Sequence, residues 1–435
     1  MRTATRLGLL LLTLPALGCG PRSAQGVSVQ PWSGPVTIKS EQVKLGVPAP
    51  SPQTSDSEVQ QVADGCNRFA LDLYRQLQGR EGNLFFSPYS ISIALAMTYA
   101  GARGETEKHL DEALHFSLPQ PRLHPAYNAL GSELARRAGE TGGPYRQGLE
   151  LHLANSLWID QRVPLLPAFL EVLGRNYHAS VWKADVTGDR EGVRADINNW
   201  VANETQGRIR ELVPPDGAAF PGGIMLVNAI YFNAPWQFKF RRENTRRGDF
   251  HLLNRKTIPV DMMSQHMHFR YAEVPGCQAA ELPYDGAETA MLILLPAEGR
   301  FREFENSLGP EAVEAIVERL SDHEVHLGLP RFDCTSGFSL KEALSAVGMA
   351  DAFRPGADFS GMAGPGDTYL TDVLHKSTVH TDEDGTVAAA GTYVGVGARV
   401  SRPVEFTADR PFIYLIRDLK TGTILFIGRV LDPRG

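Results

Sequence analysis

The chain has 435 residues, of which 43% are hydrophobic and 21% are charged. This composition is ordinary for a globular protein with a large core, and it excludes disorder of the whole chain. The net charge of −7 comes without a basic run, which excludes nucleic acid as the expected partner. The length would fit two or three average domains, but large mixed folds often exceed that size, so it leaves the number of domains open.

The first residues have the layout of a secretory signal. Arg2 and Arg6 precede an apolar stretch, 7–14, that is too short to cross a bilayer, and small residues lead to Cys19. The run Ala16-Leu17-Gly18-Cys19 resembles a bacterial lipobox, in which the cysteine carries a lipid anchor. We therefore expect an exported protein with a signal at 1–19. It would be a lipoprotein of the outer membrane or cell surface or, with a plain signal peptide, a secreted protein.

The next segment, 20–57, is rich in proline, serine, glutamine and glycine and has no helical or strand periodicity, which predicts a flexible tether. The folded region is expected to be a single domain at 58–435. Its cysteines, Cys66, Cys277 and Cys334, are widely spaced. They allow at most one disulfide bond and form no paired metal motif, so we expect buried thiols.

The folded region opens with apolar residues at helical spacing, from Val62 to Leu77. In chain order, the expected elements are a helix at 62–77, a strand at 83–88, a helix at 91–100, a strand at 149–159, helices at 167–177 and 192–212, strands at 224–232 and 291–295, a helix at 311–320, a strand at 325–329, a helix at 338–347, and strands at 412–416 and 424–430. The segment 224–232 is apolar on both faces, which places it at the centre of a covered sheet. Asn228 within it would be buried and needs hydrogen-bond partners. Helices and strands alternate without a βαβ repeat, so the fold class is α+β.

The motifs of common enzymes and metal sites are missing from the sequence. There is no Gly-x-Ser-x-Gly turn, no phosphate-binding glycine loop and no His-Glu-x-x-His helix, and the spacing of His323 and His326 does not fit the zinc motif. The acidic run 382–385 resembles part of a calcium loop, but Gly391 stands where that loop needs a glutamate. We expect no catalytic residue, no metal and no cofactor.

The stretch from Glu383 to Phe412 contains mostly small residues and is longer than ordinary connections. Within it, four small uncharged residues alternate along the chain, so they would share one face if the segment became a strand. These residues are Thr386, Ala388, Ala390 and Thr392. The pattern indicates a loop that is able to enter a sheet, although a mobile surface loop without function would have a similar composition.

One peptide bond in this stretch is a good substrate for a trypsin-like protease. Arg399 lies sixteen residues beyond Glu383 and is followed by Val400. The other basic residue nearby, Arg402, precedes Pro403, whose imino nitrogen makes a poor scissile bond. We therefore expect cleavage at Arg399–Val400.

From about Val59 to Pro433 the chain resembles a serpin, a member of the serine protease inhibitor superfamily of the bacterial type. The family's motifs occur in the right order and at the right spacing. They are NLFFSPYSI at 83–91, GARGET at 101–106, LVNAIYF at 226–232 followed by Trp236, LPRF at 329–332, HK at 375–376, EDGTVAAAGT at 383–392 and ADRPF at 408–412. Each motif is modestly specific, but the set is very specific.

The resemblance implies a serpin fold, with about three β-sheets surrounded by roughly eight to nine helices and an exposed reactive-centre loop. It also implies a suicide mechanism, in which cleavage at Arg399 leaves an acyl-enzyme and the loop inserts into the main sheet. The implied hinge consists of Glu383, Gly385, Thr386, Ala388, Ala389, Ala390, Gly391 and Thr392. The implied sheet-opening residues are Ser87, Ser90, Asn228 and His375, with Trp236 at the top of the sheet. The expected partner is a trypsin-like serine protease in a covalent complex, the expected state is a monomer, and any membrane contact is through Cys19.

The chain departs from the family pattern at two points. Val387 stands where many inhibitory members carry glutamate, but this side chain should face outward and valine favours strands. The segment after Arg399 is one residue longer than in common members. The position of the scissile bond is therefore determined only to within about one residue. The small, uncharged hinge favours an inhibitor over the alternative, a non-inhibitory serpin that acts as a binding or structural protein. A cysteine protease, which also forms an acyl intermediate, is the alternative target.

Overall fold

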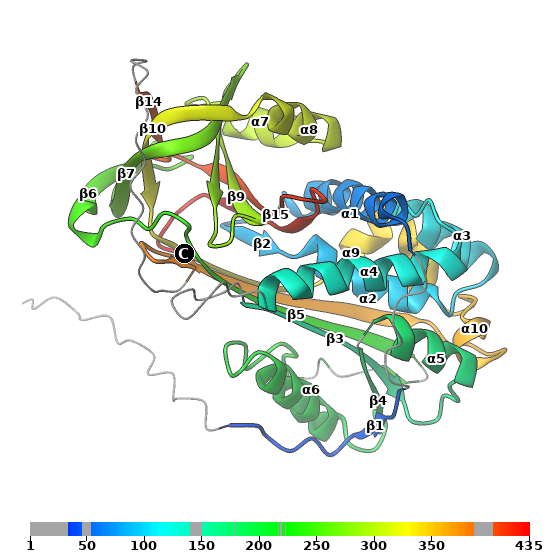
Figure 1. Cartoon of the computed structure of the whole chain (residues 1–435). Coiled ribbons are helices and arrows are strands. Elements are labelled where there is room, and N and C mark those ends of the chain that lie inside the picture. Colours follow the sequence, from blue (N-terminus) through cyan, green and yellow to red (C-terminus); the bar gives the residue numbers. More distant parts are fainter. Residues whose placement is uncertain are drawn as a thin grey trace, which may run out of the picture. The chain divides into compact units, whose positions relative to one another are not determined.

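The computed structural model describes residues 34–45, 54–139, 150–177, 179–215, 217, 220–221, 223–386 and 403–435 (Figure 1). These residues fold into β-sheets with helices packed around them, which confirms the α+β class. The described strands form two hydrogen-bonded sheets instead of the three that the resemblance implied. The reason is β7, Thr257–Val274, which pairs with β6, β8 and β10 along its 18 residues and so joins their strands in one sheet.

The main sheet has the strand order β1, β4, β3, β5, β12, β11, and the short β13 pairs with one end of β5. The bounds are β1 Glu41–Val43, β4 Ser180–Ala184, β3 Glu150–Asp160, β5 Ile224–Pro235, β12 Leu370–Thr381, β11 Phe332–Ser339 and β13 Gly385–Thr386. Almost every residue of β5 is buried, as expected for a strand whose two faces are both apolar.

The second sheet has the order β14, β10, β7, β8, β9, β15, β16, β2, with β6 paired to β7. The bounds are β14 Val404–Thr407, β10 Ser321–Pro330, β8 Cys277–Pro283, β9 Thr289–Pro296, β15 Phe412–Asp418, β16 Ile424–Val430, β2 Leu84–Phe86 and β6 Arg246–His251. Its β15–β16 hairpin is buried along both strands and forms much of the core.

Helices cover both faces of the main sheet (Figure 1). On one face, α6 (Arg190–Glu204) packs through Ile197 and Trp200 against a small core that includes Trp158 and Met225. On the other face lies the main core, where all twelve residues of α2 are buried. The bounds of the other helices are α1 Asp56–Leu77, α2 Pro88–Tyr99, α3 Gly104–Ala113, α4 Gln120–Gly139, α5 Pro167–Asn176, α7 Phe301–Ser307, α8 Pro310–Arg319, α9 Lys341–Leu344 and α10 Ser360–Ala363.

Part of the expected tether lies against the folded body. Residues 41–43 form β1, which pairs antiparallel with β4, and the backbone N–H groups of Lys39 and Ser40 donate to the Asp196 carboxylate on α6 at 3.0 and 2.6 Å. Asn203 on α6 exchanges two hydrogen bonds with the backbone of Val36, each 2.8 Å long. We call residues 34–45 the N-terminal strap. The prediction of a flexible tether is therefore wrong for residues 34–45, which include a paired strand. Strand pairing uses backbone groups, so it does not require the side-chain periodicity by which a strand is recognised in a sequence.

Two predicted helices differ in extent from those observed. The helix predicted at 192–212 ends at Glu204, because Gly207 follows with φ of 75° and the chain turns there. In the segment 338–347, Phe338 belongs to β11, and a helix begins only at Lys341. The β11 backbone pairs with β12 along its whole length, and this tertiary pairing outweighs the local helical pattern.

The three cysteines of the folded region are buried and unpaired, as the sequence predicts. Burial raises the pKa of Cys277 and of Cys334 to about 12, so both thiols are protonated and unreactive at neutral pH. Within the described residues, no helix combines the length and the apolar composition that a membrane span requires.

Candidate functional site

The strands β5 and β12 lie side by side at the centre of the main sheet and run parallel. Their pairing extends from Leu370 opposite Ile224 to Thr378 opposite Tyr231, with one shift in register near its start. Beyond these pairs, β13 runs antiparallel beside the last residues of β5. We call the β5–β12 pairing the central joint.

A row of polar side chains crosses the main sheet at the central joint. Asn155 on β3 lies opposite Asn228 on β5, and Asn228 lies opposite His375 on β12. The Asn228 amide group donates to the Asn155 side-chain oxygen and to the Ser90 hydroxyl, and His375 Nδ1 shares a short hydrogen bond with Asn228 Oδ1. All four residues are buried. Hydrogen bonds between polar side chains thus connect three adjacent strands to α2, which lies beneath them.

The bonding of His375 identifies its tautomer. The backbone N–H of Ser87 donates to His375 Nε2 at 3.3 Å, so the proton of the neutral ring lies on Nδ1 and is donated to Asn228. Burial lowers the pKa of His375 to about 3, which keeps the ring neutral at pH 7. The Ser87 hydroxyl accepts from the backbone N–H of Ser90 and donates to the Leu425 carbonyl at 3.2 and 2.7 Å. The polar row is therefore fixed to the start of α2 and to the second sheet.

Trp236 follows directly after β5, next to β13. Its indole N–H donates to the Asp382 carbonyl at 3.0 Å, and its backbone N–H donates to the Asp384 carbonyl at 3.1 Å. Its ring stacks on Tyr284 with a centroid distance of 4.7 Å. The residues that follow β12 are thus bound to the end of β5.

The buried carboxylate of Glu383 forms an ion pair with the partly exposed Arg331 at the base of the loop. Arg331 Nε lies 2.9 and 3.0 Å from the two carboxylate oxygens, and the Thr245 hydroxyl also donates to the carboxylate. Burial by itself raises the pKa of Glu383, but the hydrogen bonds from Arg331 and Thr245 outweigh burial and lower the pKa. The carboxylate is therefore charged at neutral pH, and the paired guanidinium holds the start of the loop beside β5.

The structure brings together Ser87, Ser90, Asn228 and His375, and it places Trp236 apart from them at the end of β5. Sequence reasoning missed one further member of the polar row, Asn155. Its signal was visible, because Asn155 is the polar interruption in an otherwise apolar alternating strand.

Of the predicted hinge, Glu383, Gly385 and Thr386 fall within the described residues. The other hinge positions lie outside them, as do Cys19, Arg399 and Val400; these positions are Ala388, Ala389, Ala390, Gly391 and Thr392. In the part of the chain that the structure describes, no group of three or more His, Cys, Asp or Glu side chains is arranged to hold a metal ion.

Comparisons with known proteins agree with this architecture. A family model described as serpin (serine protease inhibitor) matches residues 64–433. An uncharacterized serpin-like protein of Thermococcus kodakarensis is 33% identical, with 99% of each chain covered, and the leukocyte elastase inhibitor of Xenopus tropicalis is 35% identical over 86% of this chain and 100% of its own. The crystal structure of the thermophilic serpin tengpin in the native state superposes with a TM-score of 0.77 at 26% identity, covering 90% of this chain and 97% of tengpin. The chain therefore belongs to the serpin family of serine protease inhibitors.

Proposed function

We propose that this serpin is a suicide inhibitor of a trypsin-like serine protease, which cleaves the Arg399–Val400 bond and is trapped when the loop enters the central joint. The observation that supports this proposal is the arrangement of β5, β12 and β13. The central joint is closed along most of its length, yet the first two residues of the loop already pair with the end of β5 in the antiparallel direction. An inserted loop would extend β13, whose first two residue pairs with β5 are present in this structure.

Extending the register of β13 gives the position that we propose for an inserted loop. Gly385 pairs with Pro235, and Thr386 pairs with Ala234. Continued residue by residue, this register brings position 396 opposite Ile224, the first residue of β5. Arg399 would then lie beyond the far end of the strand, about 40 Å from β13 at ~3.3 Å per residue. A protease attached to Arg399 would be carried along the full length of β5.

The same register fits the small residues of the loop to the main core. Directly opposite residues of a strand pair share a face, so Thr386, Ala388, Ala390 and Thr392 would face as their partners on β5 do. Those partners are Ala234, Phe232, Ile230 and Asn228, of which the three apolar ones belong to the main core. Thr392 would meet Asn228 of the polar row, where its hydroxyl can form a hydrogen bond. No charge would be buried by this insertion.

The chemistry of trapping follows from the acyl-enzyme step. The protease serine attacks the Arg399 carbonyl and forms an ester, while the amide nitrogen of Val400 takes a proton and leaves as a new amino terminus. The severed loop is then free to insert before water hydrolyses the ester. Each backbone hydrogen bond gained by insertion contributes about 0.5–1.5 kcal/mol, and a strand as long as β5 forms bonds on both of its edges. This gain is available to distort the catalytic site of the attached protease.

The trypsin-like specificity of the proposal depends on Arg399, because a guanidinium forms a bidentate pair with a carboxylate at the base of a protease pocket. Trypsin mixed with the protein should give a band on a denaturing gel at the summed mass, together with a peptide that begins at Val400. Arg399→Ala should remove most of this product, and Arg402→Ala should not. Equal trapping by Arg399→Ala would show that another bond is cleaved.

The same experiment separates the proposal from a non-inhibitory serpin. A non-inhibitory member would be cut without forming the covalent band, and its cleaved form would melt no higher than the intact form. If papain, but not trypsin, is trapped at Arg399, the target is a cysteine protease.

We also propose that the protein is exported and anchored through Cys19, on the strength of the basic, apolar and small-residue order of residues 1–19. Growth with a radiolabelled fatty acid in a bacterial host should label the wild-type protein but not Cys19→Ser. An unlabelled but exported wild-type protein would indicate a plain signal peptide.

A further inference from the structure

Three of the chain's 12 histidines lie together on the exposed face of the second sheet. His266 and His268 belong to β7, and His326 belongs to β10, which pairs antiparallel with β7. His266 and His326 lie directly opposite each other, and their rings meet edge to face with a centroid distance of 4.0 Å. Side chains alternate along a strand, so the other histidine of β10, His323, faces the opposite side, where its ring contacts Tyr271. The strand pairing thus gathers three imidazoles on one face.

Each of these three imidazoles contacts a carboxylate on a neighbouring strand. The pairs, with nitrogen–oxygen distances of 3.0, 2.8 and 3.1 Å, are His266 with Glu324, His268 with Asp322, and His326 with Glu405. Asp322 and Glu324 belong to β10, and Glu405 belongs to β14, the edge strand of the sheet. The three imidazoles are about half exposed. We call these six residues the histidine–carboxylate face.

The other charged side chains around this face have bonds of their own. Arg270 on β7 forms a 2.6 Å ion pair with the buried Glu281 on β8. On β6, which pairs with the first part of β7, Arg247 lies 3.5 Å from Asp261, and Arg246 donates to backbone carbonyl groups. The three carboxylates and the three imidazoles therefore dominate the charge of the histidine–carboxylate face.

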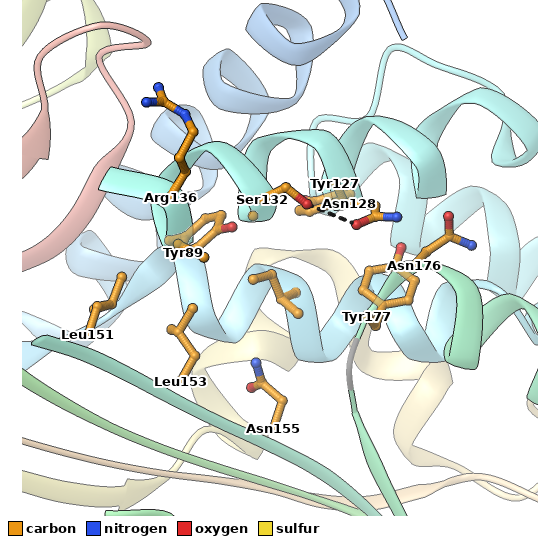
Figure 2. A pocket seen from close by; sticks show the side chains of 13 residues that line it. Tyr89, Tyr127, Asn128, Ser132, Arg136, Leu151, Leu153, Asn155, Asn176 and Tyr177 are labelled. Carbon is orange, nitrogen blue, oxygen red and sulfur yellow. Dashed lines mark hydrogen bonds between the residues drawn. The ribbon is translucent and has the colours of Figure 1, made fainter. Parts of the chain in front are cut away.

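Exposure allows these groups to change their charge without the penalty that burial imposes. The interior of the protein differs in this respect. His375 is fully buried, and the pocket between α4 and β3 in Figure 2 is lined mainly by apolar, aromatic and amide side chains, with Arg136 as the charged one. A change of charge with pH is thus easier on the histidine–carboxylate face than inside the molecule.

The charge of this face depends on the protonation of its histidines. Histidine side chains gain a proton as the pH falls through the range of roughly 8 to 5, in which carboxylates stay charged. With neutral imidazoles, the three carboxylates make the face acidic. With protonated imidazoles, each carboxylate has a cation beside it, and the charges cancel. The face therefore changes from acidic to neutral as the pH falls.

The histidine–carboxylate face lies near the bond that we propose as the cleavage site. Glu405 follows Arg399 by six positions in the chain, and six residues span at most about 22 Å. A protease domain is about 30 Å or more across. A protease bound at Arg399 would therefore lie beside β14, and its surface would come within reach of the charges on β14 and β10.

We propose that the histidine–carboxylate face is a docking surface for a positively charged patch of the target protease, and that acid weakens this contact by protonating the histidines. The proposal rests on the function proposed above, because it places the protease at Arg399. Oppositely charged surfaces steer the encounter of two proteins, so the effect is on the rate of association.

The charge of the face is tested with cationic trypsin, by the rate at which the intact inhibitor disappears on a denaturing gel. This rate counts trapped and merely cleaved molecules alike. The double variant Glu324→Gln, Glu405→Gln should react about threefold more slowly than the wild type at low salt. About 0.5 M salt should remove the difference, because salt screens exposed charges.

The matched control changes the net charge equally at a distant place. Glu105→Gln, Glu112→Gln alters two exposed residues of α3, which lies on the opposite side of Figure 1 from β14. This control should react as fast as the wild type. Trypsin with acetylated lysines should react equally fast with all three proteins, since acetylation removes its positive charges. Equal rates of the wild type and the Glu324→Gln, Glu405→Gln variant with unmodified trypsin would overturn the proposal.

The role of the histidines is tested at pH 8 and pH 5.5. Glutamine can donate a hydrogen bond to a carboxylate but gains no proton, so the triple variant His266→Gln, His268→Gln, His326→Gln stays acidic at pH 5.5. The ratio of its rate to the wild-type rate should rise about threefold between pH 8 and pH 5.5. The activity that trypsin itself loses in acid cancels in this ratio. An equal ratio at both pH values would overturn the role of the histidines.

The same gels separate this proposal from the proposed function. Cleavage at Arg399 without any covalent complex would overturn inhibition, and the cleavage rates would still decide whether the face binds the protease. If trypsin does not cleave at Arg399, both proposals are overturned.

Discussion

The main sheet contains two neighbouring joints that share β5, and they are built differently. Between β3 and β5 the strands are antiparallel, and core-facing leucines meet apolar partners, as in the pair of Leu157 and Leu226. In the central joint the strands are parallel, and β12 presents His375 and Ser377 to the same side. Farther along β12, the buried Thr381 hydroxyl has no hydrogen-bond partner in the described part of the chain.

This difference indicates which joint can open. Parting two apolar strands exposes surface at a cost of about 25 cal/mol per Å², with nothing to replace the lost contacts. When two strands with polar contacts separate, the hydrogen bonds between them are lost, each with a net contribution of only about 1 kcal/mol. An incoming strand that offers new hydrogen-bond partners can replace them. In the proposed insertion, the threonines of the loop would supply such partners. The polar row also crosses the β3–β5 joint through Asn155, so the distinguishing feature of the central joint is the pair of buried polar residues on β12, His375 and Ser377. Under the proposed mechanism, the central joint is the one that accepts a strand, and this can be tested by comparison with the β3–β5 joint.

The largest effect should come from charge on the inserting face. In Thr386→Arg, a guanidinium would have to enter the core beside Ala234, at a cost of several kcal/mol. The fraction of trypsin trapped should fall at least about 10-fold, with the inhibitor cleaved as a substrate, as measured by densitometry of a denaturing gel.

Val387→Arg is the matched control, because position 387 would face the opposite side of the inserted strand. This variant should trap trypsin nearly as well as the wild type. Equal loss of trapping in both variants would contradict the register derived from β13.

The next effect concerns the apolar joint, which should persist after insertion. Leu157→Ala leaves a cavity in the main core beneath β3 and β5 and should destabilise the protein by about 2–5 kcal/mol. Because this joint does not open, the loss should be similar in the intact and the cleaved forms, as measured by chemical denaturation of each. A loss confined to the intact form would mean that the β3–β5 joint also rearranges.

The polar joint should make stability depend on pH. His375 has its pKa lowered to about 3 in the folded protein, from an ordinary value of 6.5, so below pH 6.5 the unfolded chain binds a proton that the folded chain does not. Stability should therefore be fully present above pH 6.5 and decline toward pH 3, by about 2 kcal/mol at pH 5. Denaturant midpoints at pH 7, 6 and 5 measure this decline.

His375→Asn provides the control, because asparagine does not titrate in this range. The variant should lose less stability than the wild type between pH 7 and pH 5. His124, whose pKa burial lowers to about 4, is present in both proteins and contributes equally to the two curves. Parallel curves would show that His375 is not the responsible group.

The smallest effect should come from the N-terminal strap. Asp196→Ala removes the acceptor of two backbone N–H groups and of the Ser40 hydroxyl, at an expected cost of about 1 kcal/mol because the strap lies partly exposed. Amide hydrogen exchange of residues 34–45 should become faster. Glu191→Ala, on the exposed first turn of the same helix, should leave that exchange unchanged.

Much of the fold could be predicted from periodicity, and the limits have physical causes. The burial of β5 and the helix α1 could be predicted from local patterns. An element that is buried on one face or on both carries its apolar residues at a characteristic spacing along the sequence. Strand pairing imposes no such spacing, so neither the register of the central joint nor the pairing of β1 with β4 was predictable. For the same reason, the sequence pattern around Phe338 predicts a helix where β11 is found.

The site shows a similar division. The resemblance indicated Asn228 and His375, but only the folded structure reveals that Asn155 extends their row to a third strand. The Glu383–Arg331 pair joins residues 52 positions apart in the chain, and a charge pair of that separation leaves no local pattern.

The pairing of β1 has a practical consequence for the protein in solution. It covers β4, which would otherwise be the edge strand of the main sheet on this side. A chain that begins at residue 54 would lack β1 and expose the unpaired backbone donors and acceptors of β4. Exposed edges of this kind recruit further strands and promote aggregation. Recombinant forms trimmed to the matched region, 64–433, would in addition lose the first turns of α1.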